Sequence, residues 1–116
     1  MSTPNSPITT HVLDTVTGRP AADLAVTLAT QEGDSWTTIA TGRTNSDGRI
    51  TDWLNGQSRQ AGTYRVTFAT GDWFKAHQRP SFYPEVSIVF TLEQPEEHYH
   101  IPLLLSDFGY STYRGS

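Results

Sequence analysis

The sequence contains no cysteine, which excludes disulfide bonds, thiolate metal sites and a cysteine nucleophile. The fold must therefore be held by packing, as suits a reducing compartment, and we expect a cytoplasmic protein. Basic residues are also scarce: eight Lys and Arg stand against twelve Asp and Glu, for a net charge of −4 at pH 7. Because this balance leaves no basic stripe to neutralise phosphates, we do not expect nonspecific nucleic-acid binding.

Long apolar segments are missing as well. No apolar run approaches the roughly 18 residues of a membrane-spanning helix, so we expect no membrane partner. Residues 1–7 have neither the basic nor the apolar region of an export signal, and the polar residues 1–6 are expected to form a flexible lead. A chain of 116 residues can bury one core but not two, which predicts a single domain over 1–116.

Alternating apolar residues are what the sequence has in abundance. The clearest pattern is Tyr64, Val66 and Phe68, which alternate with polar neighbours as in a half-buried strand. Similar runs predict strands at 8–13, 24–30, 36–40, 86–92 and 98–105, with a last strand after a turn at 106–109. Only residues 70–79 fit a short helix. This pattern indicates an all-β protein, an antiparallel β-sandwich of seven to eight strands with one short helix.

The strand predicted at 98–105 separates two kinds of side chain. Alternate residues of a strand point to opposite faces, so His98 and His100 share one face while Tyr99 and Ile101 share the other, apolar face. After the turn, residues 110–116 can return as an antiparallel partner. A Tyr, an Arg and a Ser would then lie alongside the histidines.

A zinc site is one interpretation of these histidines, because His98 and His100 point two imidazoles the same way and His11 could complete the set. Against it, the sequence offers no evident second shell, and Arg49 and Arg114 would add positive charge if they converge there. We therefore expect no metal and no cofactor.

A nucleophilic serine is a weaker interpretation, and other residues of the sequence have ordinary structural explanations. Ser111 and Ser116 lie near the histidines in sequence, yet the nucleophile context of a Ser-His-Asp triad is absent. An Arg after an Asp-Gly turn, as at Arg49, is ordinarily a solvated strand start. Trp53 and Trp73 are candidates for surface or interface positions.

Five stretches, in this order, resemble the 5-hydroxyisourate hydrolase family, the transthyretin-like enzymes of urate degradation. They are Thr-His-Val-Leu-Asp at 10–14 followed by Gly-Arg-Pro-Ala at 18–21, Thr-Asn-Ser-Asp-Gly-Arg at 44–49, Phe-Tyr-Pro-Glu-Val at 82–86, His-Tyr-His-Ile-Pro-Leu-Leu-Leu-Ser at 98–106, and Tyr-Ser-Thr-Tyr-Arg-Gly-Ser at 110–116. The resemblance covers nearly the whole chain. Its terminal Tyr-Arg-Gly-Ser separates the enzyme from transthyretin, a hormone carrier on the same scaffold.

The resemblance implies a transthyretin-like protomer that assembles as a homotetramer, with active sites in a channel where protomers meet. Carried over position by position, the catalytic residues would be His11, Arg49 and His100. The residues implied to bind substrate are Tyr113, Arg114, Gly115 and Ser116, with Ser111 beside them.

Two positions stand apart from the implied site. His98 matches a position that the family does not mark as catalytic, and it is expected farther out along the strand. Asp107 departs from the family, which commonly has Pro there, and this affects the last turn rather than the catalytic set.

The implied reaction is hydrolysis of 5-hydroxyisourate, an oxidised bicyclic purine, to 2-oxo-4-hydroxy-4-carboxy-5-ureidoimidazoline. Neutral His11 or His100 could take a proton from the attacking water, and which of the two does so stays open. Arg49 would stabilise the charge on the carbonyl oxygen, and Arg114 would orient the substrate. The alternatives are a noncatalytic carrier of the transthyretin type and a structural β-sandwich module.

Overall fold

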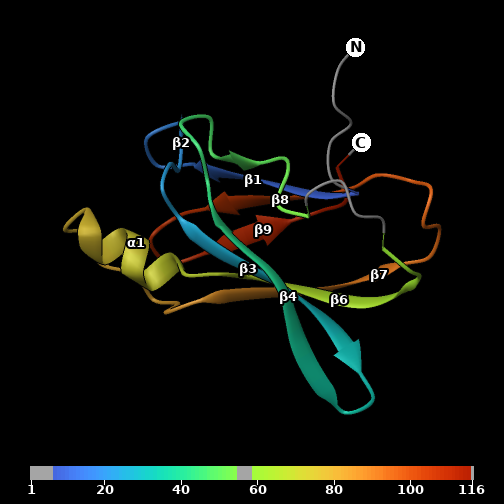
Figure 1. Ribbon diagram of the computed structural model, residues 1–116. Coiled ribbons are helices and arrows are strands. Elements are labelled where there is room, and N and C mark those ends of the chain that lie inside the picture. The colour runs from blue at the N-terminus through green and yellow to red at the C-terminus, as the bar shows by residue number, and fades with distance from the viewer. Residues whose placement is uncertain (1–6, 55–58, 116) are drawn as a thin grey trace.

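The computed structural model describes residues 7–54 and 59–115, which fold into two stacked β-sheets with a short helix at one end (Figure 1). The helix is α1 (Thr70–Ala76). One sheet has the order β4 (Ser35–Arg43), β3 (Ala25–Glu32), β6 (Gly62–Phe68) and β7 (Val86–Leu92). The other has the order β2 (Arg19–Pro20), β1 (Ile8–Asp14), β8 (Tyr99–Leu105) and β9 (Tyr110–Thr112), with β5 (Arg49–Ile50) also paired to β1. The predicted all-β sandwich with one short helix is confirmed.

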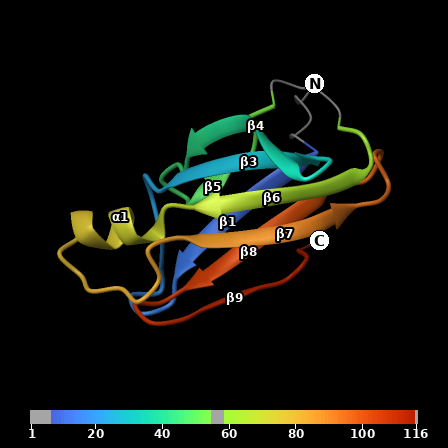
Figure 2. The same ribbon diagram turned by 90° about the horizontal axis from the view of Figure 1, so that it is seen from below.

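The core lies between the two sheets, where the alternating apolar residues meet. Figure 2 shows β3, β6 and β7 lying over β1 and β8. Val66 and Phe68 of β6 are fully buried, and so is Leu103 of β8, whose neighbours on the same face are Tyr99 and Ile101. The period of two in the sequence therefore predicted the inward faces of these strands correctly.

One pairing differs from the expected antiparallel arrangement. β1 and β8 run parallel, in a register that begins at Ile8 opposite Tyr99 and ends at Asp14 opposite Leu105. All other strand pairs in the described part of the chain are antiparallel. The parallel register places Thr9 opposite His100, so the side chains that face outward from β1 and β8 come together.

The helix is shorter than predicted, and its tryptophan is inside. α1 ends at Ala76 rather than at residue 79, because Gln78 adopts a positive φ of 53°. Trp73 is buried, and its indole nitrogen donates a hydrogen bond to the Ala22 carbonyl at 2.8 Å. Its expected surface position was wrong. No helix in residues 7–54 or 59–115 is long and apolar enough to cross a membrane.

An ionic cluster joins the segment after α1 to the end of the β1–β8 pair where both strands finish. Arg79 donates to the Asp14 carboxylate at 2.6 Å and to the Asp107 carboxylate at 2.5 Å. Thus Asp107, where the resembled family commonly has Pro, ties the turn between β8 and β9 to the end of the helix.

Candidate functional site

Three of the predicted site residues share the outer face of the β1–β8 sheet. His11 lies on β1 directly opposite Arg49, the first residue of β5, and His100 lies on the adjacent strand β8. All three side chains project from the face of the sheet that does not pack on the core, as the parity of the strands predicts. The structure therefore brings two imidazoles and a guanidinium together.

A tight turn puts Arg49 in this position. The Asn45 side-chain oxygen accepts hydrogen bonds from the backbone N–H groups of Asp47 and Arg49, at 2.9 and 3.0 Å. Gly48, between these two residues, has a φ of 75°, and a β carbon there would lie 2.5 Å from the Val12 carbonyl oxygen. Glycine thus permits the close approach that seats β5 against β1.

The electrostatics of the site favour neutral imidazoles. Burial lowers the pKa of His11, and the Arg49 charge lowers it further, although a hydrogen bond to the Asp47 backbone and the Asp47 charge oppose this. Burial likewise lowers the pKa of His100, the Arg49 charge lowers it next, and the neighbouring imidazoles of His98 and His11 would also oppose a charge on it. Since both pKa values lie below the ordinary histidine value, both rings are neutral and able to accept a proton at pH 7.

Thr9 is the site residue that the sequence did not reveal. Its hydroxyl lies 2.8 Å from Nδ1 of His100 and 2.9 Å from Nε2 of His98. His98 lies farther out than His100, just before β8, and the centroids of the two rings are 6.3 Å apart. Thr9 has the same parity as His11, and this was the available signal; its opposite neighbour could not be known without the parallel pairing of β1 and β8.

The tail after β9 meets the site through Gly115. Its N–H donates to the His100 carbonyl at 2.9 Å, so the tail pairs antiparallel with the start of β8. Ser111 of β9 lies opposite Leu104 of β8 and is exposed. Ser116, also predicted to bind substrate, lies outside the described residues.

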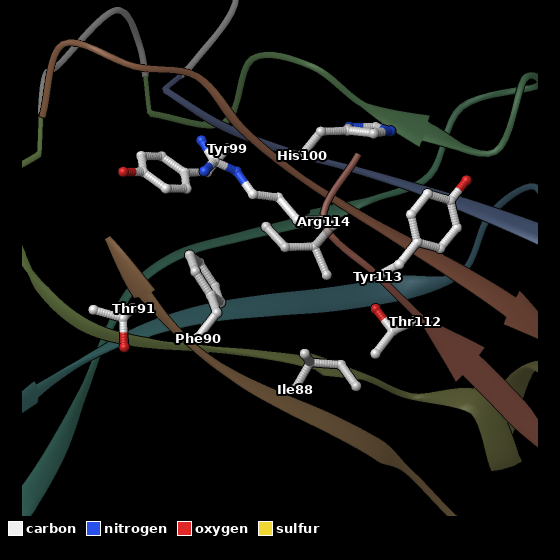
Figure 3. A pocket seen from close by; sticks show the side chains of 9 residues that line it. Ile88, Phe90, Thr91, Tyr99, His100, Thr112, Tyr113 and Arg114 are labelled. Carbon is white, nitrogen blue, oxygen red and sulfur yellow. The ribbon is translucent and has the colours of Figure 1, made fainter. Parts of the chain in front are cut away.

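The Arg114 side chain extends toward Tyr99 and the loop before β8. Its guanidinium lies over the Tyr99 ring at 4.3 Å and forms an ion pair with Glu97 at 2.9 Å. Figure 3 shows this side chain reaching toward Tyr99, while the His100 imidazole points to the other side. Within one protomer, the Arg114 guanidinium is thus engaged by Glu97 and Tyr99.

A cavity of about 250 Å³ opens beside the tail. Ile88 and Phe90 of β7 and Ile101 of β8 give it apolar lining. Tyr113 and Arg114 also line it (Figure 3). His100 also borders it, so the cavity and the outer face of the sheet meet at this residue.

The part of the chain that the structure describes contains no cluster of ligands for the zinc site that the histidines could suggest. No group of three or more His, Cys, Asp or Glu side chains among residues 7–54 and 59–115 is arranged to hold a metal ion. His98 and His100 are bridged by the Thr9 hydroxyl instead.

Comparison with known proteins gives matches over almost the full length. The model of the HIUase/Transthyretin family matches residues 8–115. A 5-hydroxyisourate hydrolase of Salmonella dublin is 43% identical over 112 residues, which are 97% of this chain and 82% of that protein.

Solved structures agree with this match. The 5-hydroxyisourate hydrolase of Klebsiella pneumoniae superposes with a TM-score of 0.82 at 38% identity, covering 94% of this chain and 98% of that one. Transthyretin from Sparus aurata gives a TM-score of 0.88 at 34% identity, covering 94% of this chain and 96% of that one.

Proposed function

Because the chain belongs to the HIUase/Transthyretin family, we propose that it is a hydrolase that opens 5-hydroxyisourate at a ring amide to give 2-oxo-4-hydroxy-4-carboxy-5-ureidoimidazoline. The observation that carries this proposal is the grouping of His11, Arg49 and His100 on one outer face, with both imidazoles held neutral. Neutral imidazoles beside a fixed cation suit the addition of water to a carbonyl carbon.

Each residue has a distinct part in this reaction. One imidazole, of His11 or His100, takes a proton from water as the oxygen attacks the ring carbonyl, and returns it to the departing ring nitrogen. Attack places negative charge on the carbonyl oxygen, and the Arg49 guanidinium stabilises that charge more in the transition state than in the ground state. The C–N bond then breaks, and the ring opens without a cofactor.

The tail is proposed to bind the substrate. Tyr113 and Gly115 are next to His100 in the structure. Ser116 completes the tail carried over from the family, and Ser111 is a further candidate beside it. Arg114 has the planar fork of donors that suits the carbonyl-rich rim of a purine, but within one protomer it is paired with Glu97. Its role in orienting the substrate stays a prediction.

Assembly as a homotetramer and a cytoplasmic location are also proposed rather than observed. The site lies on the open face of a sheet, and β7 and β9 are edge strands in the described part of the chain. An open face can become a channel when a second protomer covers it, as the family resemblance implies. Light scattering on the purified protein would give the assembly state.

The direct test is an assay on 5-hydroxyisourate generated in situ by a urate oxidase. The ultraviolet absorbance of the substrate should decay faster with this protein than without it, and equally fast in the presence of a chelator. Decay at the spontaneous rate would overturn the proposal, whereas loss of the acceleration with chelator would return a metal to the mechanism.

A carrier is the second candidate, because a structure of sea bream transthyretin in complex with thyroxine is 36% identical and has a TM-score of 0.87. Deleting residues 113–116 separates the two functions. A carrier should keep its affinity for a small aromatic ligand after the deletion, but a hydrolase should lose turnover because Gly115 no longer contacts His100.

A further inference from the structure

We propose that Thr9 is a positioning residue that sets which nitrogen of His100 carries the proton, with His98 as the acceptor at the far end of the chain of hydrogen bonds. The catalytic consequence rests on the proposed function, but the protonation pattern itself does not. The role follows from three atoms: Nδ1 of His100, Oγ1 of Thr9 and Nε2 of His98.

The three atoms form one connected chain. Thr9 Oγ1 lies 2.8 Å from His100 Nδ1 and 2.9 Å from His98 Nε2, both ordinary hydrogen-bond distances. Thr9 is 2% exposed, so its hydroxyl is shielded from water that could replace either ring. The parallel register of β1 and β8 holds Thr9 directly opposite His100.

A count of protons leaves two arrangements. A hydroxyl has one proton to donate, so with both rings neutral it donates to one of them and accepts from the other. If His100 donates from Nδ1, Thr9 donates to His98, and Nε2 of His100 carries a free lone pair. If His98 donates from Nε2, Thr9 donates to His100, and the His100 proton moves to Nε2.

The surroundings favour the first arrangement for catalysis. With Nδ1 engaged by Thr9, Nε2 is the nitrogen of His100 left for water and substrate, and a base needs its lone pair there. The charged and titratable groups near His100 are Arg49 on β5, His11 on β1 and His98, and the first of these disfavours added positive charge on the ring. Nε2 of His98, 2.9 Å from the Thr9 hydroxyl, is then the acceptor of the Thr9 proton.

The chain of hydrogen bonds also survives the reaction cycle. When Nε2 takes a proton from water, the His100 imidazolium still donates its Nδ1 proton to the Thr9 hydroxyl. The hydrogen bond from Thr9 to His98 therefore does not have to change. When Nε2 passes that proton to the departing ring nitrogen, the starting arrangement returns.

The experiment measures the ¹⁵N chemical shifts of the His100 ring in the full-length protein, at a pH where the histidines are neutral. The wild-type protein should show Nδ1 protonated and Nε2 bare. Thr9→Val should shift His100 toward a mixture of tautomers, and Thr9→Ser should restore the wild-type pattern. His98→Phe should move the proton to Nε2, because the Thr9 hydroxyl then has only His100 to donate to.

Thr10→Val is the matched control. It removes a buried hydroxyl from the same strand, one that donates to the Ile101 carbonyl at 2.6 Å and faces the core. It should leave the His100 shifts unchanged.

The tautomer results decide the inference separately from activity. Wild-type shifts for His100 in both Thr9→Val and His98→Phe, or an Nε2-protonated ring in the wild-type protein, would overturn it. If the shifts change as expected but no variant and no wild-type sample hydrolyses 5-hydroxyisourate, the proposed function fails and the Thr9 role stands.

Discussion

Gly115 lies so close to His100 that a β carbon at position 115 would be 2.6 Å from Cδ2 of the imidazole. The N–H of the same glycine donates to the His100 carbonyl at 2.9 Å. Tail and ring are therefore packed against each other, and only glycine fits without moving one of them. The absence of a side chain at position 115 is what allows the tail to lie alongside the candidate base.

Gly115→Ala should lower hydrolysis of 5-hydroxyisourate by about 10²-fold in kcat, because a displacement of about 1 Å at a catalytic group costs that much. The added methyl group must push the imidazole or the tail out of place. Steady-state kinetics would measure the loss.

Gly62→Ala is its matched control. Nothing lies within 4 Å of a β carbon built on Gly62, which begins β6 without a positive φ. It should keep wild-type activity. Equal activity in both variants would show that the tail does not position His100.

His11→Ala and His100→Ala should each lower the rate by about 10²- to 10⁴-fold, the contribution of a positioned acid or base. Neither side chain belongs to the core, so both variants should fold, which circular dichroism can check. His77→Ala is the control, since His77 lies at the end of α1, with Nδ1 2.7 Å from the Trp73 carbonyl oxygen. Wild-type turnover in either site variant would remove that histidine from the mechanism.

Arg49→Gln should raise the pKa of both His11 and His100. Burial is the main cause of their lowered pKa and the Arg49 charge is the next, so removing the charge removes part of the shift. NMR titration of the imidazole protons would measure this without substrate. Because the neutral ring is the active form, the acid limb of kcat/KM should also move to higher pH.

Arg49→Lys is the control for charge, since it should keep the pKa values of the two histidines low. It should still lose activity, because an ammonium lacks the planar fork of a guanidinium. Unchanged histidine pKa values in Arg49→Gln would show that the guanidinium does not act on the rings through its charge.

The local pattern of the sequence was enough to predict the strands and their faces. Tyr64, Val66 and Phe68 alternate with polar residues, and the structure buries all three. The same period correctly placed His100 of β8 and His98, the residue just before β8, on the same side of the sheet. These features depend on neighbours a few residues apart, whose side-chain directions are set by the strand itself.

Contacts between distant segments could not be predicted in the same way. No local signal shows that β1 runs parallel to β8, so Thr9 gave no sign of lying opposite His100. The burial of Trp73 depends on the Ala22 carbonyl, which is likewise remote in sequence. The direction of Arg114 depends on Glu97 and Tyr99, whose loop and strand had to be placed first.

The Arg79 cluster gives the sharpest stability prediction. The Asp14 side chain is only 3% exposed and is paired with Arg79 at 2.6 Å. Arg79→Met should lower the free energy of unfolding by about 3 kcal/mol or more, because it leaves a buried carboxylate without its partner. Arg43→Met is the control: its pair with Asp23 is 61% and 79% exposed, so the loss should be below about 1 kcal/mol. Urea unfolding at one protein concentration would measure both.

The pH dependence separates lost charge pairing from lost packing in Arg79→Met. Burial alone would raise the pKa of Asp14, but hydrogen bonds from Arg79, Thr17 and the Val16 N–H outweigh it, and the pKa of Asp14 is lowered in the folded protein. The ionised Asp14 carboxylate therefore contributes its full stabilisation above the unfolded pKa of about 4, and this contribution is lost as the pH falls below that value. In Arg79→Met, the pKa of the unpaired Asp14 carboxyl should instead rise. Its protonation at lower pH should then reduce the destabilisation that the buried charge causes. The stability gap between wild type and Arg79→Met should thus be widest at pH 7 and narrow toward pH 4, whereas a gap that does not depend on pH would mean that Arg79 acts mainly by packing on Phe74.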